Sequence, residues 1–211
     1  MKRVIKDPVV RRKEIIQVAE KLFAEQGYAK TSVEAIIHNA GIAKGTFYHY
    51  FKSKDELLGA IVEQIGLDLQ SYYSAILSTQ GISAVEKLQR MLRGPEKDAI
   101  SNSAVMDIVH THANRELQEK MNIQTIEVIA PLIAQVLVQG NEEGIFNAKN
   151  PEEIVQILLA GSQFLLDGGL FEWSAEKQVA LLQTFQTLFE SAIGVKPGEL
   201  DFITLMGSHL D

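Results

Sequence analysis

The amino-acid sequence contains no cysteine, only five prolines and a single tryptophan among its 211 residues. The lack of cysteine excludes disulfides and thiolate metal sites, and it fits a reducing compartment. No uninterrupted apolar run approaches the roughly 18 residues of a membrane span, and the opening MKRVIKDPVVRRKEI lacks the apolar stretch of a secretory signal. We therefore expect a cytoplasmic protein with no membrane partner.

Negative charge is scarce in the first quarter of the chain. Residues 1–54 hold 11 Lys/Arg against 5 Asp/Glu, a net charge of +6, whereas residues 55–211 hold 9 against 22, a net charge of −13. A basic segment on an acidic remainder is typical of a protein that presents one end to a polyanion. Such segregation also arises by chance, so it supports a DNA-binding motif but does not establish one.

A motif of the right kind lies in residues 31–58, TSVEAIIHNAGIAKGTFYHYFKSKDELL. Thr31 and Glu34 have the spacing of a capping box at a helix start, and Gly41 can end that helix by adopting a positive φ. A second short helix is expected over residues 44–50, and a serine capping box begins a third. This is the layout of a helix-turn-helix, in which the second helix enters the DNA major groove.

The second helix of this motif divides into an inward aromatic pair and an outward polar set. Phe47 and Phe51 point to the core, and the outward residues are Lys44, Thr46, Tyr48 and His49. Gly45 has no side chain, so the backbone there can approach a base edge or a phosphate. Lys54 adds a cation in the first turn of the next helix, where backbone N–H groups also point outward. The alternative is an ordinary surface helix over a buried aromatic pair, in which all these features coincide by chance.

These residues resemble the N-terminal signature of the TetR (tetracycline-repressor) family of bacterial transcription regulators. The resemblance rests on Thr31-Ser32 before the first helix, Ala40-Gly41-Ile42 in the turn, Gly45-Thr46-Phe47-Tyr48-His49-Tyr50-Phe51, and Lys54-Asp55-Glu56-Leu57. It covers about the first 58 residues, and the rest is similar only in helical character and length. Ala43 departs from the serine that commonly caps the recognition helix, and the loss of such a cap costs about 1 kcal/mol.

The resemblance implies a homodimeric repressor that a small-molecule effector releases from a pseudo-palindromic operator in double-stranded DNA. Residues 1–54 would form the DNA-binding domain, and residues 55–211 the effector-binding and dimerisation domain. The expected DNA-binding residues are Thr31, Ser32, Lys44, Gly45, Thr46, Tyr48, His49 and Lys54. A helical small-molecule-binding protein without specific DNA binding and a helical-bundle enzyme are the two alternatives.

Helical periodicity continues along the chain and predicts an all-α fold. The first helix begins at Pro8 and braces the motif, and the fourth runs as a stiff rod from Ser53 to about residue 77. Further helices are expected over residues 83–93, 96–112 and 114–139, from Asn150 onward, and over 174–193. Pro131 removes a backbone donor inside the 114–139 helix and predicts a kink there. The pattern does not place the tail, residues 196–211.

The last two long helices carry apolar residues around much of their girth, including Ile154, Val155, Leu158, Leu159, Leu165 and Leu166. A helix that is apolar all round needs partners on two sides, which are either its own core and a second subunit or the interior of a monomer. The resemblance implies the second subunit, through a four-helix bundle of the two C-terminal helices from each chain. Two-fold symmetry would place two recognition helices about 34 Å apart.

Motifs of catalysis and cofactor binding are missing. The sequence has no glycine-rich phosphate loop, HExxH or G-x-S-x-G, and a lone Asp107-x-x-His110 falls short of the paired Glu-x-x-His motifs of a di-iron bundle. His110 and His112 lie two residues apart, which on a helix separates them by about 200° and is poor for chelation. We therefore expect no enzyme activity, no cofactor and no bound metal.

The resemblance also implies an effector cavity among the middle helices of the larger domain. The candidates by position and chemistry are Met91, Met106, His110, Met121, Phe164 and Trp173. Methionine adapts to irregular ligands, although a methionine or aromatic residue at helical spacing is more often plain core. Asp107 or Asp167 could meet a cationic ligand or lie on a solvated face. The identity of the effector does not follow from the sequence.

Overall fold

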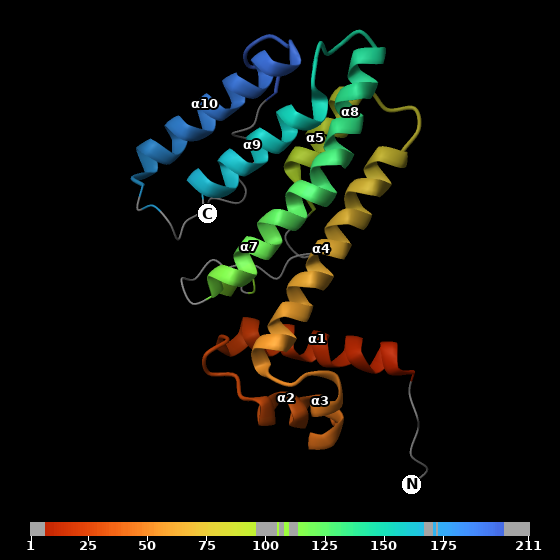
Figure 1. The fold of residues 1–211 in the computed structure, drawn as a ribbon, viewed down its shortest axis with the longest axis vertical. Helices are drawn as coiled ribbons and strands as arrows, with labels where there is room; N and C mark the ends of the chain where they lie inside the picture. Colours follow the sequence, from red (N-terminus) through yellow and green to blue (C-terminus); the bar gives the residue numbers. More distant parts are fainter. Residues whose placement is uncertain are drawn as a thin grey trace.

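The structure, a computed structural model, describes residues 7–95, 105, 108–109, 114–166, 171 and 173–200, and within these residues every regular element is helical. Figure 1 shows a small head at one end of the molecule and a larger body at the other, joined by one long helix. The head contains α1 (Pro8–Gln26), α2 (Val33–Asn39) and α3 (Lys44–Tyr50), and α4 (Lys54–Ser78) is the joining helix. The body adds α5 (Ala84–Arg93), α7 (Arg115–Gln124), the π-helical η2 (Thr125–Ile129), α8 (Ala130–Glu142), α9 (Pro151–Leu165) and α10 (Ala175–Ile193).

The all-α fold is confirmed, and side-chain caps explain several helix boundaries. The hydroxyls of Ser53, Ser83 and Ser174 each accept a hydrogen bond from the backbone N–H three residues further on, at 3.0, 3.2 and 3.2 Å. These serines therefore begin α4, α5 and α10. Pro8 and Pro151 begin α1 and α9, where the missing N–H would have no helical partner in any case.

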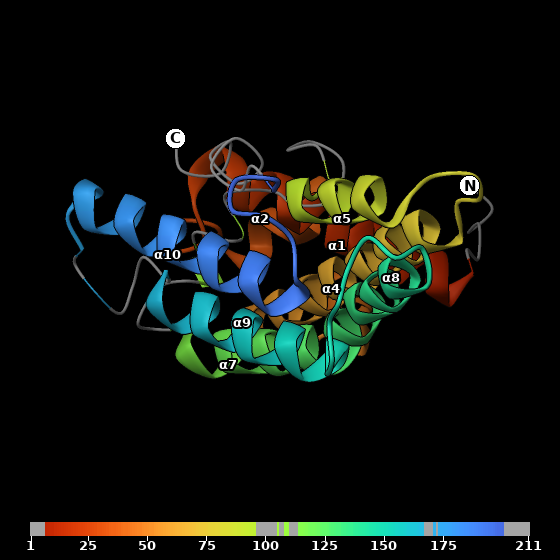
Figure 2. The same ribbon diagram turned by 90° about the horizontal axis from the view of Figure 1, so that it is seen from above.

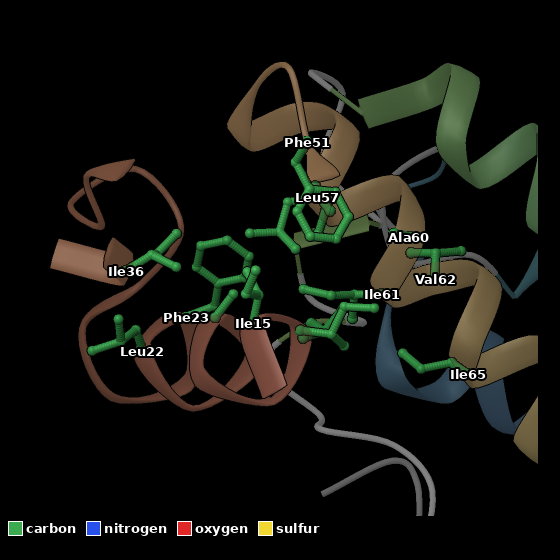
Figure 3. Close-up of a cluster of buried hydrophobic side chains, with 14 of the residues drawn as sticks. Ile15, Leu22, Phe23, Ile36, Phe51, Leu57, Ala60, Ile61, Val62 and Ile65 are labelled. Atoms are coloured by element: carbon green, nitrogen blue, oxygen red, sulfur yellow. The ribbon is translucent and has the colours of Figure 1, made fainter. Parts of the chain in front are cut away.

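One hydrophobic cluster holds the head together, and Figure 3 shows part of it. Its largest fully buried side chains come from α1, α2, α3 with the residue that follows it, and the first half of α4: Ile15, Phe23, Ile36, Phe47, Phe51, Leu57, Leu58 and Ile61. Val105 and Val109, further along the chain, are buried in the same cluster. Burying one such side chain contributes about 1.5–3 kcal/mol, so α1 and α4 supply stability that two short helices could not generate alone. The predicted bracing of the motif by the first helix is confirmed, because Leu22 and Phe23 of α1 belong to this cluster together with Ile36, Phe47 and Phe51.

Among the described residues, helix α4 contributes to the two hydrophobic clusters, one in the head and one in the body. Its first half lies in the head cluster, and Ile76 near its C-terminus lies in the body cluster. At 1.5 Å per residue its 25 residues span about 37 Å. The hydroxyls of Tyr72 and Tyr73 donate to backbone carbonyls at the end of α5, at 2.9 and 3.1 Å. Head and body are therefore joined by a continuous helix that is packed at both ends.

At Pro131, where the sequence predicts a kink, the structure has a π-helical turn just before the proline. Helix α7 continues through η2 into α8, and the Ala130 N–H donates to the carbonyl of Thr125, five residues back. Pro131 has no N–H, and its ring would crowd the preceding turn of a regular α-helix. The wider π turn accommodates the proline without ending the helix.

By length and average hydropathy the continuous helix Arg115–Glu142 could cross a membrane, although it contains no long uninterrupted apolar run. The core helix of a soluble protein meets the same criteria. Helix α8 packs against α4, α5 and α9, and its buried residues are Ala130, Ile133, Ala134, Val136, Leu137 and Gly140. We therefore interpret Arg115–Glu142 as the central helix of the body.

Helices α9 and α10 lie side by side along one flank of the body, as Figures 1 and 2 both show. The chain then folds back onto α10. The carboxylate of Glu190, 1% exposed, accepts hydrogen bonds from the Gly198 and Leu200 N–H groups at 2.9 Å and from the Gln186 amide at 3.0 Å. Burial alone would raise the pKa of Glu190, but these hydrogen bonds to its charged form lower it.

This anchor places the first part of the tail that the sequence left unplaced, because Leu200 is buried in the body cluster. Residues 201–211 lie outside the part of the chain that the structure describes. The predicted helix over residues 96–112 also lies outside it, except at positions 105, 108 and 109, which are helical.

Candidate nucleic-acid interface

Helix α2 begins one residue later than the sequence pattern predicts. Ser32 is the capping residue, and its hydroxyl accepts a hydrogen bond from the Ala35 N–H at 3.1 Å. The Thr31 side chain is 1% exposed, and its hydroxyl donates to the carbonyls of Gly27 at 2.8 Å and Leu22 at 3.3 Å. The predicted Thr31 capping box is therefore wrong. The buried Thr31 side chain instead ties the α1–α2 loop to the end of α1 through these hydrogen bonds, and Ser32 is the exposed residue of the two.

A tight turn sets α3 against α2. Gly41 has a φ of 61°, in the left-handed region that residues with a Cβ rarely adopt. The N–H groups of Gly41 and Ile42 donate to carbonyls in the last turn of α2, at 3.1 and 3.2 Å. The partly buried Ile42 side chain packs against the head cluster. The two short helices and this glycine turn have helix-turn-helix geometry.

Helix α3 buries one face and presents the other to solvent, as predicted. Phe47 is fully buried, whereas the outward residues are exposed or half-buried: Lys44, Gly45, Thr46, Tyr48 and His49. A Cβ placed on Gly45 would meet no atom within 4 Å. Packing inside the head therefore does not require glycine at this position, and the open space allows a partner to approach the backbone closely.

The N-terminus of α3 lacks a side-chain cap, as Ala43 predicts. Ala43 has an extended backbone conformation, with φ −75° and ψ 150°, and it makes no side-chain capping bond. The first turn closes through the backbone instead, because the Thr46 N–H donates to the Ala43 carbonyl at 2.8 Å. The cap is thus replaced by a backbone bond within a tight first turn.

Lys44 is the cation on the exposed face of α3. Its ammonium lies 3.9 Å from the Glu34 carboxylate and 5.9 Å from the centroid of the Tyr48 ring. Both members of the Lys44–Glu34 pair are exposed, and an exposed pair at this distance contributes little to stability. The Lys44 ammonium can therefore leave Glu34 for another anion at a small cost in free energy.

The Lys54 ammonium faces the loop between α1 and α2. Its Nζ donates to the carbonyls of Tyr28 at 2.7 Å and Thr31 at 3.0 Å, and it lies 4.1 Å from the centroid of the Tyr28 ring. The Tyr28 hydroxyl donates to the Asp55 carboxylate, and burial together with this bond raises the pKa of Tyr28. Sequence reasoning missed Tyr28 because 26 residues separate it from Lys54 and no local pattern links them.

The effector candidates within the described residues do not line one shared cavity. Met91 is buried in the body cluster. Met121 lines a groove of about 810 Å³ between α1, α4 and α7, and Phe164 lines a second groove of about 560 Å³ between α7, η2 and α9. Trp173 stacks on Phe171 with ring centroids 4.8 Å apart. The other predicted residues lie outside the described positions: Met106, Asp107, His110 and Asp167.

A short exposed helix after a tight glycine turn, braced by α1 and carried on a rigid helix from a larger body, defines a helix-turn-helix DNA-binding regulator. Residues 15–61 match the family described as bacterial regulatory proteins, tetR family, and residues 97–188 match a tetracyclin repressor-like C-terminal domain. The chain belongs to the TetR family of bacterial regulatory proteins. Members of this family are transcriptional regulators and not enzymes, in agreement with the sequence expectation.

Curated relatives and solved structures agree with this assignment. The repressor DhaR of a Mycobacterium species is 31% identical over 194 residues, which cover 86% of this chain and 91% of DhaR. The repressor KstR2 of Mycolicibacterium smegmatis is 29% identical over 65% of this chain and 66% of KstR2. A TetR/AcrR-family regulator from Thermobifida fusca is 26% identical and superimposes with a TM-score of 0.58, covering 85% of this chain and 97% of that one.

Proposed function

We propose that this protein is a repressor that binds a pseudo-palindromic operator as a homodimer and leaves it when a small-molecule effector binds the body. The observation that carries this proposal is the solvent-facing side of α3, which presents Lys44, Gly45, Thr46, Tyr48 and His49, with open space above the Gly45 backbone. Residues 1–54 are assigned to DNA binding, and residues 55–211 to effector binding and dimerisation.

Each residue on α3 has a role that follows from its chemistry. Lys44 is released from its loose pair with Glu34 to contact a phosphate. Thr46, Tyr48 and His49 carry hydrogen-bonding groups that can reach base edges in the major groove. Ser32 retains an exposed hydroxyl for the DNA backbone, whereas the buried Thr31 supports the loop behind it.

The dimer is assigned to α9 and α10, which leave large apolar side chains uncovered. Ile157 is 72% exposed, Leu188 57% and Phe164 56%, and Val179 on α10 is also exposed. A second copy related by a two-fold axis would cover this flank and form a four-helix bundle. The same axis would present two copies of α3 to half-sites about 34 Å apart.

Effector control requires a ligand that prefers one arrangement of the two heads. The two grooves beside α7 are the candidate sites, because a ligand in either would touch the helix that packs on α4. Helix α4 is rigid and packed at both ends, so a shift of α7 against it would change the separation of the heads. A ligand that binds the splayed arrangement more tightly shifts the population away from the DNA-bound form.

Selection from random duplexes tests the proposal. The purified protein should enrich a pseudo-palindromic sequence, and its affinity for that duplex should fall steeply as salt rises. In the selected complex, Tyr48→Ala or Thr46→Ala should lower the affinity for the operator more than the affinity for random duplex, if these side chains contact bases. A protein that binds no duplex at low salt would contradict the proposal and favour the alternative of a small-molecule-binding protein without specific DNA binding.

A further inference from the structure

Apolar side chains on the continuous helix Arg115–Glu142 are spaced in multiples of four residues. Each of them is buried in one of the two hydrophobic clusters or packs against one: Leu117, Met121, Ile129, Ile133 and Leu137. Four residues of a regular α-helix advance by about 400°, so the five steps from Leu117 to Leu137 would set these two side chains about 200° apart. In a regular α-helix, the two ends of the series would therefore point in nearly opposite directions.

The π turn before Pro131 removes about half of that rotation. The Ala130 N–H donates to the Thr125 carbonyl, five residues back, so this turn takes up one residue more than an α turn. One residue corresponds to about 100°, which brings Leu117 and Leu137 to about 100° apart, the width of one apolar stripe. The π turn thus sets the register of α7, meaning its rotation and axial position relative to α8.

A regular α-helix through residues 125–129 would shift this register by one residue. Helix α7 would rotate by about 100° and move about 1.5 Å along its axis, so each of its residues would take the place of the one before it. Leu117 and Met121 pack against the head cluster and line the groove between α1, α4 and α7. Gln118 and Asn122 would take their places there. We call the observed arrangement the π register and the shifted one the α register.

The two registers are favoured by opposing contributions. Pro131 favours the π register, because in a regular helix its ring would crowd the carbonyl of Glu127, four residues earlier. The α register would move Ile123, which is 50% exposed, to the half-buried place of Asn122. This burial partly offsets the loss of apolar contacts at the head cluster. Proline inside a helix also kinks it without always ending it, so the α register is accessible to this chain.

We propose that Pro131 and the π turn hold α7 in one of two registers, and that an effector acts by shifting α7 from one to the other. The inference rests on the proposed function and specifies its regulation. The π register packs Leu117 and Met121 against the head cluster, so it is assigned to the DNA-bound form. A ligand that hydrogen-bonds to the amides of Gln118 and Asn122 in the groove would bind the α register more tightly and shift the population toward it.

Introduced disulfides report the register, because the chain contains no cysteine of its own. A Cβ placed on Gly66 of α4 would lie 2.6 Å from atoms of the Gln124 amide, so position 124 faces position 66 in the π register. In the α register Thr125 takes that place. The first reporter is therefore Gly66→Cys with Gln124→Cys. The second is Gly66→Cys with Thr125→Cys, to which Gln124→Ala is added to remove the amide that would crowd position 66.

Gly66→Cys with Ile123→Cys is the matched control, since position 123 faces position 66 in neither register. The rate of disulfide formation is measured for each pair with Pro131 present and with Pro131→Ala. With the proline present, the 66–124 pair should close at least about tenfold faster than the 66–125 pair. Pro131→Ala should raise the rate of the 66–125 pair by at least about tenfold, while the 66–123 pair stays slow.

DNA binding is measured on the same proteins with a duplex selected from a random pool. The duplex should slow closure of the 66–125 pair in Pro131→Ala, because it binds the π register more tightly. The oxidised 66–125 form should bind the duplex at least about tenfold more weakly than the oxidised 66–124 form, and reduction should remove the difference.

Gln118→Leu with Asn122→Met tests the same exchange with Pro131 intact. These substitutions supply apolar side chains to the places that Leu117 and Met121 would leave. The α register would then keep its packing against the head cluster, so the 66–125 pair should again close faster than in the unsubstituted chain. This second variant shares no substituted position with Pro131→Ala, so the two together test the register independently of either change.

A 66–125 rate that stayed low in both variants would show a single register and overturn the proposal. Equal rises for the 66–123 and 66–125 pairs would indicate general loosening of α7 and would also overturn it. So would equal affinities of the two oxidised forms, or closure rates that the duplex did not change. If the protein without substitutions bound no duplex, the proposed function itself would fail, and the closure rates without DNA would still test the two registers.

Discussion

The uncapped start of α3 should be open to repair by a single substitution, Ala43→Ser. The backbone at Ala43 has φ −75° and ψ 150°, close to the values of −68° and 160° at Ser83 and of −63° and 154° at Ser174, both of which cap helices. A serine hydroxyl at position 43 would therefore be placed to accept from the Thr46 N–H without a change in the backbone. Side chains of this kind stabilise a helix by about 0.5–2 kcal/mol.

The gain should lie in the lower half of that range. The Thr46 N–H already donates to the Ala43 carbonyl at 2.8 Å, so the new hydroxyl would improve a partly satisfied donor. We expect Ala43→Ser to add about 0.5–1 kcal/mol to the free energy of unfolding. For a chain of this length, that corresponds to a rise in Tm of about 1–4 °C if the protein unfolds as one unit.

Thermal unfolding and hydrogen exchange of the Thr46 and Phe47 amides measure this effect. Exchange should slow by about twofold to fivefold, which is the same free energy expressed as an equilibrium constant for local opening. Ala43→Val, which adds no hydroxyl and ranks with alanine as a capping residue, should not slow it. Ser32→Ala is the reciprocal control and should lower stability by about 1 kcal/mol. If Ser32→Ala destabilised as expected and Ala43→Ser changed neither Tm nor exchange, the missing cap would not limit the stability of α3, and our reasoning would be wrong.

Three further predictions concern the body. Glu190→Gln should lower the free energy of unfolding by about 2 kcal/mol in urea titrations at neutral pH, because the Gly198 and Leu200 N–H donors lose an anionic acceptor. The pKa of Glu190 in the folded protein lies below the ordinary 4.5, so the difference in unfolding free energy between wild type and variant should shrink as the pH falls below about 4.5. A difference that stayed constant with pH would contradict this prediction. Gly140→Ala should destabilise the protein by about 1–3 kcal/mol, because the new Cβ would lie 1.9 Å from a ring carbon of Phe146. At Gly59 a Cβ would meet no atom within 4 Å, so the control Gly59→Ala should be neutral or stabilise the protein by up to about 1 kcal/mol. Ile157→Asp should convert the proposed dimer to a monomer in sedimentation experiments, whereas Val9→Asp, at a similarly exposed position on α1, should not. A monomeric wild type would contradict the assignment of α9 and α10 as the interface.

Features encoded within a few residues were predictable from the sequence. The caps at Ser53, Ser83 and Ser174 act over three residues, so the spacing of polar and apolar side chains was sufficient to find them. The inward and outward faces of α3 likewise follow from helical periodicity, since Phe47 alternates with exposed neighbours within two turns. The resemblance to TetR regulators was recognisable because its signature lies in one continuous stretch.

Features that depend on distant parts of the chain were not predictable in this way. Thr31 and Ser32 are both good capping residues, and the choice between them is made by the Leu22 and Gly27 carbonyls, which accept from Thr31. The Glu190 anchor is formed only when the following turn folds back onto α10. Grooves of the body depend on how several helices pack together, so the candidate effector residues could be chosen by chemistry but not assembled into a cavity.

Helix α4 contributes side chains to the hydrophobic cores of both head and body, and this limits where the two parts can be separated to build a hybrid protein. Leu57, Leu58, Ile61 and Ile65 belong to the head core, so a hybrid regulator that joins this head to a foreign sensor at residue 54 would replace part of the cluster that contains Phe23 and Phe51. A seam placed beyond Ile65 would keep the part of that core that α1 to α4 supply, but the foreign sensor would have to replace Val105 and Val109, which are buried in the same cluster. For the design of biosensors, the segment to transfer is therefore the head together with the first half of α4.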